Sequence, residues 1–371
     1  MALARESHVE ELHVEVFDIP TDQPEADGTL SWDATTLVLV RARGGGCEGL
    51  GWTYDTSACK AVIDDQLASV VCGHSIFDVP AANEAMRRAC RNLGGPGVAA
   101  CAISAVDIAL WDLKARVLEL PLADLLGRAV KRVPIYGSGG FTSYDDQTTR
   151  AQLERFCHKW SIPRVKIKVG ESRGQAERRD LERVALARKT IGPDVELFVD
   201  ANGAYTRKQA IRLGAVMAAE HGVSWFEEPV SSDDLAGLRE VRDQCQLDVA
   251  AGEYGYAPWY FAPMIAAEAV DCIQADVTRC GGITAWRDVA GLAAAHQLQI
   301  SGHCAPNLHV HVAISAANLR HLEYFHDHVQ IEEMLFDGTL PPTGGALVPE
   351  RQAPGHGMTL RENEAARYRV A

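Results

Sequence analysis

The chain has 371 residues, of which 47% are apolar and 23% are charged, and this composition excludes an intrinsically disordered protein. Its formal net charge of -14 argues against nucleic acid or an anionic membrane surface as a partner, because both are bound through clustered Lys and Arg. The longest stretch without Asp, Glu, Lys or Arg, residues 289–319, contains several His and Gln and is too polar for a membrane span.

The start of the chain and its cysteines indicate where the protein resides. The first residues, MALARESHVEEL, carry charges where a secretory signal needs an unbroken apolar segment. The 10 cysteines stand singly, without a CxxC pair. We therefore expect a cytoplasmic protein with reduced thiols.

Residues 1–125 have the pattern of an α+β domain. Two strand-like runs, LHVEVFDI and TTLVLVRARG, flank an acidic stretch from about Pro20 to Trp32 that is predicted as a loop. The segment VAACAISAVDIALWDLKARVLEL then has apolar residues at helical spacing, and Pro121 ends it. Strands followed by helices are typical of an α+β unit.

From about Val133 onward, short apolar runs alternate with helix-sized segments. The strand candidates are VPIYGSG, RVKIKVG, VELFVD, VSWFEEP, LDVAAGE, CIQADV, LQISGH and HLEYF. One connection has Thr206 and Gln209 in capping-box spacing and stops at Gly222, which predicts a helix over 206–221. Seven or eight such repeats predict a TIM barrel or a doubly wound sheet, and the count and the lack of a Gly-rich phosphate turn favour the barrel.

Nearly every predicted strand of this region ends in an ionisable residue. A charge at one strand end is ordinary, but these are spaced by 20 to 32 residues, about one βα repeat, and would converge on the carboxyl-terminal face of one barrel. That face carries the active sites of such barrels. The residues are Lys166, Lys168, Asp200, Glu227, Glu253, Asp276, His303 and Glu323.

Three of these residues, Asp200, Glu227 and Glu253, are carboxylates on consecutive strands. Packed together they would repel one another unless a cation neutralises them. Because the set contains no Cys or His, Mg²⁺ is favoured over Zn²⁺. The neighbouring Glu228 would point the other way along a strand, so no ligand role is predicted for it.

Two further pairs predict acid/base chemistry. Lys166 and Lys168 project from one face of a strand, and a neighbouring ammonium lowers a lysine pKa, so Lys168 is a candidate base; the alternative is two solvated lysines on an edge strand. His303 and Asp276 end adjacent strands, where the carboxylate would orient the imidazole and make it a second base.

These motifs resemble the enolase superfamily, in its mandelate racemase subgroup (mandelate racemase/muconate lactonizing enzyme family). The resemblance rests on KIK at 166–168, DANGAY from 200, FEEP at 226–229, AGE at 251–253, DVTRCGGIT from 276, GH at 302–303, WDLKAR from 111 and PLADLLG from 121. It implies an α/β fold with a TIM-type (β/α)7β barrel over residues 126–339. An α+β capping domain would comprise residues 1–125, with residues 340–371 packing back onto it.

The resemblance also assigns roles to the individual residues. Mg²⁺ held by Asp200, Glu227 and Glu253 would bind a substrate carboxylate and stabilise the enediolate that forms when the α-proton is removed. Lys168 and His303, the latter oriented by Asp276, would act as acid/base groups on opposite faces. Lys166 would adjust the pKa of Lys168, and Asn202 would help to bind the substrate. Glu323 would hydrogen-bond the substrate carboxylate, or it is an ordinary charge at the end of a strand.

Two bases permit either 1,1-proton transfer or loss of a β-hydroxyl, and which base acts first stays open. We expect a lyase that dehydrates an acid sugar to a 2-keto-3-deoxy sugar acid, because many relatives with this residue set do so and the lid around Asp18–Leu30 is polar. The alternative is a racemase or epimerase of a 2-hydroxy acid, and a remote one is a non-catalytic metal-binding barrel. The expected partners are a small carboxylate substrate and further copies of the chain in a homo-oligomer, with no nucleic acid and no membrane.

Overall fold

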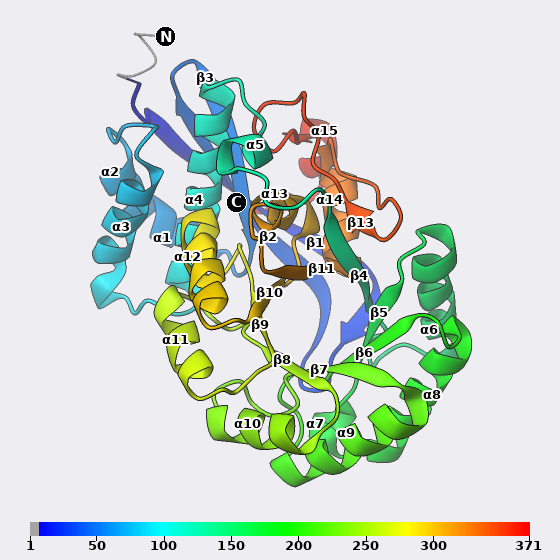
Figure 1. Ribbon diagram of the computed structural model, residues 1–371. Coiled ribbons are helices and arrows are strands. Elements are labelled where there is room, and N and C mark those ends of the chain that lie inside the picture. Colours follow the sequence, from blue (N-terminus) through cyan, green and yellow to red (C-terminus); the bar gives the residue numbers. More distant parts are fainter. Residues whose placement is uncertain (1–6) are drawn as a thin grey trace.

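A closed barrel of eight parallel strands forms the larger part of the computed structural model, which describes residues 7–371. The strands pair in chain order, and β11 closes the ring by pairing with β4 (Figure 1). The predicted TIM-type barrel is therefore confirmed. Its strands are β4 (Val133–Gly139), β5 (Arg164–Lys168), β6 (Glu196–Asp200), β7 (Val223–Glu227), β8 (Asp248–Ala251), β9 (Cys272–Ala275), β10 (Gln299–Gly302) and β11 (Leu319–Phe325).

Helices connect the strands and cover the outside of the ring (Figure 1). The helix that follows β6 begins at Thr206 with the predicted capping box to Gln209, and it ends at Gly222 in the left-handed conformation. The helices of this region are α6 (Asp146–Glu154), η4 (Arg155–Lys159), α7 (Glu171–Gly174), α8 (Glu177–Ile191), α9 (Arg207–His221), α10 (Leu235–Gln244), α11 (Pro258–Ala266), α12 (Gly282–Ala295), α13 (Pro306–Ala313) and α14 (His326–Leu335).

Aromatic side chains fill the barrel one layer before the strand ends. Tyr136, Phe198 and Trp225 pack around the ring of His321, whose Nδ1 lies 2.9 Å from Ser301 Oγ. Phe198 and Trp225 each precede a predicted metal ligand by two residues, and side chains two apart on a strand share a face. The packed layer thus forms the floor under the strand-end residues.

The N-terminal region is an antiparallel three-stranded sheet covered by helices. The strands are β1 (Glu11–Ala26), β2 (Ser31–Gly44) and β3 (Cys47–Tyr54). Gly49 and Gly51 let β3 lie directly on α4, because a Cβ at either position would collide with the α4 backbone. The helices are α1 (Ala58–Val62), η2 (Ile63–Leu67), α2 (Ala68–Val71), α3 (Val79–Ala89), η3 (Cys90–Asn92), α4 (Val98–Val117) and α5 (Leu122–Leu126).

The acidic stretch predicted as a loop is instead the end of a long hairpin, so that prediction is wrong. β1 continues to Ala26 and β2 starts at Ser31, with an irregularity in register between Pro20 and Glu25. Tertiary contacts account for the difference, since the Glu25 carboxyl is buried and accepts a hydrogen bond from Trp32 Nε1 at 3.1 Å. The hairpin tip reaches the barrel, where Thr142 donates hydrogen bonds to the carbonyls of residues 26 and 27.

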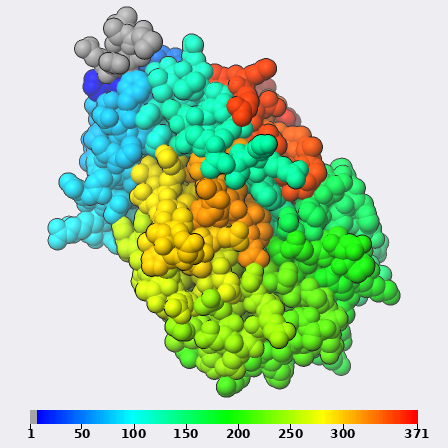
Figure 2. Space-filling view, in the orientation of Figure 1, coloured from blue at the N-terminus to red at the C-terminus, as the bar shows by residue number. Residues whose placement is uncertain are grey.

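The C-terminal segment returns to the N-terminal sheet. The amide of Val16 donates to the carbonyl of Ala371 at 2.7 Å, and the amide of Asp18 donates to that of Tyr368 at 2.9 Å. In the space-filling view the C-terminal segment (red) lies at the same end of the molecule as the N-terminal region (blue to cyan) (Figure 2). The segment contains β12 (Phe336–Asp337), β13 (Ala346–Leu347), which pairs with β4, β14 (Thr359–Leu360) and α15 (Glu362–Ala365).

Two further properties concern the described chain as a whole. Every helix within residues 7–371 is too short or too polar to cross a lipid bilayer. All ten cysteines carry free thiols.

Candidate active site

The strand register places three of the predicted residues side by side. Lys168 on β5 is the register partner of Asp200 on β6, which in turn pairs with Glu227 on β7. Glu253 follows the next strand, β8, by two residues. One carboxylate oxygen from each of Asp200, Glu227 and Glu253 lies within 4.8 Å of the other two, and all three residues are buried.

The three carboxylates fit a hard divalent cation. They supply only oxygen atoms, and Glu253 Oε2 is buried without a hydrogen-bond partner among the described residues. Burial, together with the charges of Asp200 and Glu323, raises the pKa of Glu227 to about 8 even though the Lys166 ammonium opposes the shift. Such crowding of buried carboxylates is relieved by a cation.

Two buried lysines carry the compensating positive charge. Lys168 Nζ lies 2.5 Å from Asp200 Oδ2, whereas Lys166 forms ion pairs with Glu227 and with Glu323, the latter at 2.8 Å. Burial, the largest single effect, and the Lys166 charge both lower the pKa of Lys168, but the carboxylates of Asp200, Glu253 and Glu323 together raise it above the ordinary value. The prediction of a lowered Lys168 pKa is therefore wrong for this arrangement, in which Lys168 is paired with Asp200.

His303 and Asp276 form the predicted pair. His303 Nδ1 lies 2.7 Å from Asp276 Oδ2, and the other oxygen of Asp276 accepts hydrogen bonds from the amide and hydroxyl of Thr278, both at 2.7 Å. Burial opposes protonation of His303, but the carboxylates of Glu253 and Glu323 and the bond to Asp276 raise its pKa. The imidazole is thus held in one orientation with Nε2 free of Asp276.

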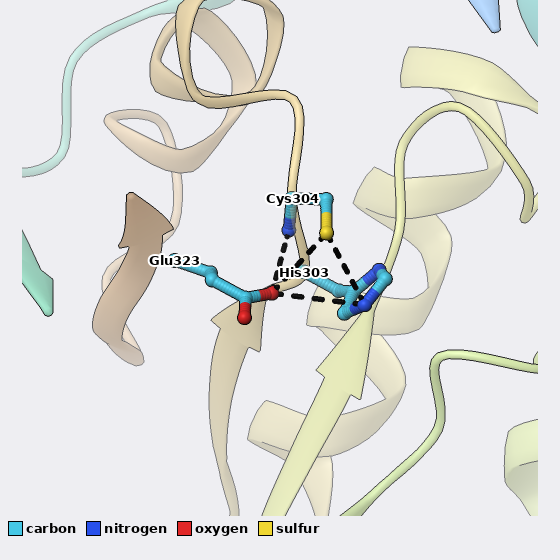
Figure 3. Close-up of side chains that lie close together, drawn as sticks. All are labelled: His303, Cys304 and Glu323. Carbon is cyan, nitrogen blue, oxygen red and sulfur yellow. Dashed lines mark hydrogen bonds and ion pairs between the residues drawn. The ribbon is translucent and has the colours of Figure 1, made fainter. Parts of the chain in front are cut away.

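Glu323 links the lysines to His303. Its Oε1 pairs with Lys166, while Oε2 accepts a hydrogen bond from the Cys304 amide at 3.0 Å and lies 3.6 Å from His303 Nε2 (Figure 3). Burial favours the neutral acid, but Lys166, His303 and Lys168 hold the pKa of Glu323 well below its usual range. Glu323 is therefore ionised in this arrangement and accepts hydrogen bonds.

Lys168, His303, Glu253 and Glu323 all face one cavity of about 290 Å³ between the barrel and the N-terminal hairpin. Asn202 also lines it; its amide N–H donates to Asp200 Oδ1 at 2.9 Å, and its side-chain oxygen is buried without a partner in the described part of the chain. The hairpin, the end of β3 and the barrel contribute the remaining wall, which includes Asp27, Leu30, Trp32, Thr35, Thr36, Tyr54, Asp55, Tyr254, Arg279, Phe325, Asp327 and His328.

Two site residues, Arg279 and Cys304, did not emerge from the sequence, and no ligand role was predicted for a third buried residue, Glu228. Arg279 Nη1 lies 3.5 Å from Glu253 Oε1 and its Nε lies 3.6 Å from Asp276, a pairing that the i,i+3 spacing from Asp276 could have indicated. Cys304 is signalled only by its position after His303. Glu228 is buried with a raised pKa and an unpartnered Oε1, and it lines a neighbouring hollow rather than the cavity of Lys168 and His303.

Two domain families match the chain. Residues 13–127 match the mandelate racemase / muconate lactonizing enzyme N-terminal domain, and residues 148–364 match the enolase C-terminal domain-like family. The L-talarate/galactarate dehydratase of Salmonella typhimurium LT2 is 31% identical over 336 residues, covering 89% of this chain and 81% of that protein. Its crystal structure with Mg and L-lyxarohydroxamate superposes with a TM-score of 0.89 at 26% identity, covering 100% and 95% of the two chains.

Two other proteins are similar over nearly the whole chain. The 3,6-anhydro-alpha-L-galactonate cycloisomerase of Streptomyces coelicolor is 28% identical over 369 residues, covering 98% of this chain and 99% of that protein. A mandelate racemase/muconate lactonizing enzyme-like protein from Rubrobacter xylanophilus has 50% identity and a TM-score of 0.94, covering 98% and 100%. Acid sugar dehydratases and cycloisomerases are therefore among the relatives.

Proposed function

The chain belongs to the mandelate racemase/muconate lactonizing enzyme family of the enolase superfamily, and from that premise we propose that it dehydrates an acid sugar to a 2-keto-3-deoxy sugar acid. The observation that carries this proposal is the single cavity faced by Lys168, His303 and the carboxylate of Glu253. Loss of water requires one group to take the α-proton and another to protonate the leaving hydroxyl.

Asp200, Glu227 and Glu253 are the residues that would hold Mg²⁺, the cofactor present in crystal structures of relatives. When bound, the ion supplies positive charge beside the substrate carboxylate, which makes the α-proton more acidic. Lys168 Nζ lies 2.5 Å from Asp200 Oδ2, so Lys168 would share the Asp200 carboxylate with a bound cation. A weaker ion pair between Lys168 and Asp200 would lower the Lys168 pKa toward the range of a base.

Lys168 and His303 divide the proton transfers in this proposal. Lys168 sits on β5 and His303 follows β10, so their side chains enter the cavity from separate parts of the ring. Lys168 Nζ accepts the α-proton, and protonated His303 Nε2 donates to the departing β-hydroxyl. Asp276 stabilises the imidazolium through its bond to Nδ1.

The other buried polar residues position these groups. Lys166, held by Glu227 and Glu323, adds positive charge beside the substrate carboxylate. Asn202 has an unpartnered buried oxygen that is available to a substrate hydroxyl. Glu323 could donate a hydrogen bond to the substrate only when protonated. In its ionised form it accepts hydrogen bonds and orients Lys166.

A panel of acid sugars incubated with the enzyme and Mg²⁺ tests the proposal directly. The expected product is a 2-keto-3-deoxy acid, with loss of one water per substrate. Incorporation of α-deuterium from D₂O without any keto acid would instead establish the racemase or epimerase alternative. Because a relative is a cycloisomerase, the panel includes an anhydro sugar acid and a sugar lactone, and turnover of these alone would reject dehydration.

A further inference from the structure

A second group of metal-ligating side chains lies in the same cavity, on the opposite side of His303 from Asp276. His303 Nε2, Cys304 Sγ and Glu323 Oε2 face one another (Figure 3). The sulfur lies 3.3 Å from Nε2 and 3.4 Å from Oε2, and the nitrogen and oxygen lie 3.6 Å apart. The proposed dehydration uses His303 but leaves the Cys304 thiol without a role.

These three separations lie within ~0.3 Å of the edges of a zinc coordination tetrahedron. Bonds of about 2.0 to 2.3 Å at tetrahedral angles place N, S and O ligand atoms about 3.4 to 3.6 Å apart. We propose that His303, Cys304 and Glu323 form a binding site for a thiophilic divalent cation such as Zn²⁺, next to the three-carboxylate site, since His303 Nε2 lies 3.5 Å from Glu253 Oε2. The fourth position would open into the cavity that all three residues line.

The surroundings of the three ligands are those of a prepared metal site. Asp276 Oδ2 lies 2.7 Å from His303 Nδ1, which is the carboxylate–histidine–metal arrangement that fixes the metal-binding nitrogen. Glu323 is held by Lys166 through its other oxygen and by the Cys304 amide. All three ligands are already ordered by packing, with exposed fractions of 5% or less.

The donor sets separate the two cations. The thiolate and imidazole of Cys304 and His303 select Zn²⁺ or Co²⁺, whereas an all-carboxylate set suits Mg²⁺. On binding, a bond forms between Sγ and the metal, the Sγ–H bond breaks, and the proton passes to solvent without any change of oxidation state. Because the bound ion takes His303 Nε2, Zn²⁺ inhibits turnover; this consequence rests on the proposed function, whereas binding itself does not.

Cobalt and zinc titrations at saturating Mg²⁺ test the site. We expect one Co²⁺ per chain to give thiolate-to-cobalt charge-transfer absorption, which Zn²⁺ abolishes. Cys304→Ser keeps the imidazole and carboxylate and should lose that absorption and weaken Zn²⁺ binding by more than ~100-fold. Cys272→Ser, at an equally buried thiol that does not line the cavity, should behave as the wild type.

The same titrations contain the results that would overturn the site. If Cys304→Ser and the wild type bind Zn²⁺ equally, or if excess Mg²⁺ displaces Zn²⁺ competitively, the zinc occupies the three-carboxylate site and the proposal is wrong. Circular dichroism of Cys304→Ser establishes that the variant is folded; if it is not, Cys304→Ala is titrated in its place. Absorption is read without turnover, so failure to find a substrate leaves this test intact.

Discussion

Each charged residue of the site is held by a neighbour of opposite charge. Lys168 is bound to Asp200, Lys166 to Glu227 and Glu323, and His303 to Asp276. Breaking one of these buried pairs leaves an uncompensated charge, which is strongly unfavourable. Substitutions that conserve shape but remove the proton-transfer group are therefore the informative ones.

His303→Asn is the most specific of these substitutions. Asparagine keeps a hydrogen bond toward Asp276 but cannot transfer a proton, so we expect kcat for keto-acid formation to fall by ~10² to 10⁴. The stabilisation of the protein by Mg²⁺ should be unchanged, because His303 is not among the three carboxylate ligands. Wild-type turnover by this variant would remove His303 from the reaction.

Removal of the metal is the second residue-scale prediction. Chelation with EDTA leaves Asp200, Glu227 and Glu253 with Lys166, Lys168 and Arg279 to offset their charge, so both activity and Tm should fall. At 100 times Kd, Mg²⁺ should add ~2.7 kcal/mol to the free energy of unfolding, measured by thermal scans with and without the ion. In Asp200→Asn, Mg²⁺ should change Tm only slightly. A change in Tm as large as that of the wild type would mean that Mg²⁺ binds elsewhere.

At the residue scale, the sequence predicted most of the side chains that the structure brings together, because strand ends in a parallel barrel converge whatever the loops do. The pairing of Asp276 with His303 also follows from their positions on adjacent strands. The pKa of Lys168 was mispredicted, because its Asp200 partner is set by strand register and cannot be weighed against Lys166 from spacing alone. Cys304 was missed because its backbone has a positive φ of 54°, which turns the thiol into the cavity.

At the scale of elements, the β1–β2 hairpin closes the cavity and is fastened to the barrel by a buried acid. Glu25 accepts hydrogen bonds from Trp32 Nε1 and from Tyr144 OH, the latter on the barrel side at 3.4 Å. Burial, and then the charges of Asp327 and Asp22, raise the pKa of Glu25 to about 9. The carboxyl is therefore protonated at neutral pH.

This raised pKa makes the attachment of the hairpin depend on pH. The folded protein retains the Glu25 proton above the ordinary pKa of 4.5, where the unfolded chain has lost it, so stability declines as pH rises from 4.5 toward 9. Glu25 alone can lower the free energy of unfolding by at most ~1.4 kcal/mol for each unit that the pH rises. The protection of the hairpin amides, that is, the intrinsic exchange rate at the same pH divided by their observed rate, should fall over this interval in the wild type.

Glu25→Gln isolates the effect, because glutamine keeps the shape and stays neutral. The protection of its hairpin amides, corrected for the intrinsic exchange rate, should depend much less on pH between 6 and 9. Asp18→Asn, which changes an exposed carboxylate of the same strand, is the matched control and should retain the wild-type profile. An unaltered profile in Glu25→Gln would show that another group governs the attachment.

The hairpin also shows why the element boundaries were only partly predictable. Pro20 and the acidic residues around it are typical of a turn. Strand β1 nevertheless continues past them, because Glu25 on β1 pairs with Trp32 on β2 and both side chains pack near the barrel. The barrel strands were predicted well because they are apolar on both faces and regularly spaced. Strand β3 was not predicted; Gly49 and Gly51, which seat it on α4, are unfavourable in an isolated strand.

At the scale of the whole molecule, the cavity is shared between the N-terminal hairpin and the barrel, and its charge is uneven. Asp27, Asp55 and Asp327 contribute acidic groups to its wall. Arg279 also lines it, but it is already paired with Glu253 and Asp276. A substrate whose first carboxylate lies beside Lys166 would therefore place a second carboxylate among acids.

We accordingly predict that monocarboxylic sugar acids are used in preference to dicarboxylic ones of the same length and stereochemistry. We expect kcat/KM for the monocarboxylic acid to exceed that for the dicarboxylic acid by about tenfold or more, since like charges in an enclosed site repel. Asp55→Asn keeps the hydrogen bond from the Thr56 amide but removes one negative charge, so the ratio of the two kcat/KM values should decrease. A preference for the dicarboxylic acid in the wild type would contradict this assignment of charge.

The pairing of residues 368–371 with β1 has a consequence for how the protein reaches its native state on the ribosome. Strand β1 is translated before the barrel, and residues 368–371, which complete its hydrogen bonding, are translated after the barrel. Until then β1 exposes unsatisfied amides and carbonyls to other nascent chains. A chaperone that shields this edge during synthesis should raise the yield of recombinant protein more than one that acts on the finished polypeptide.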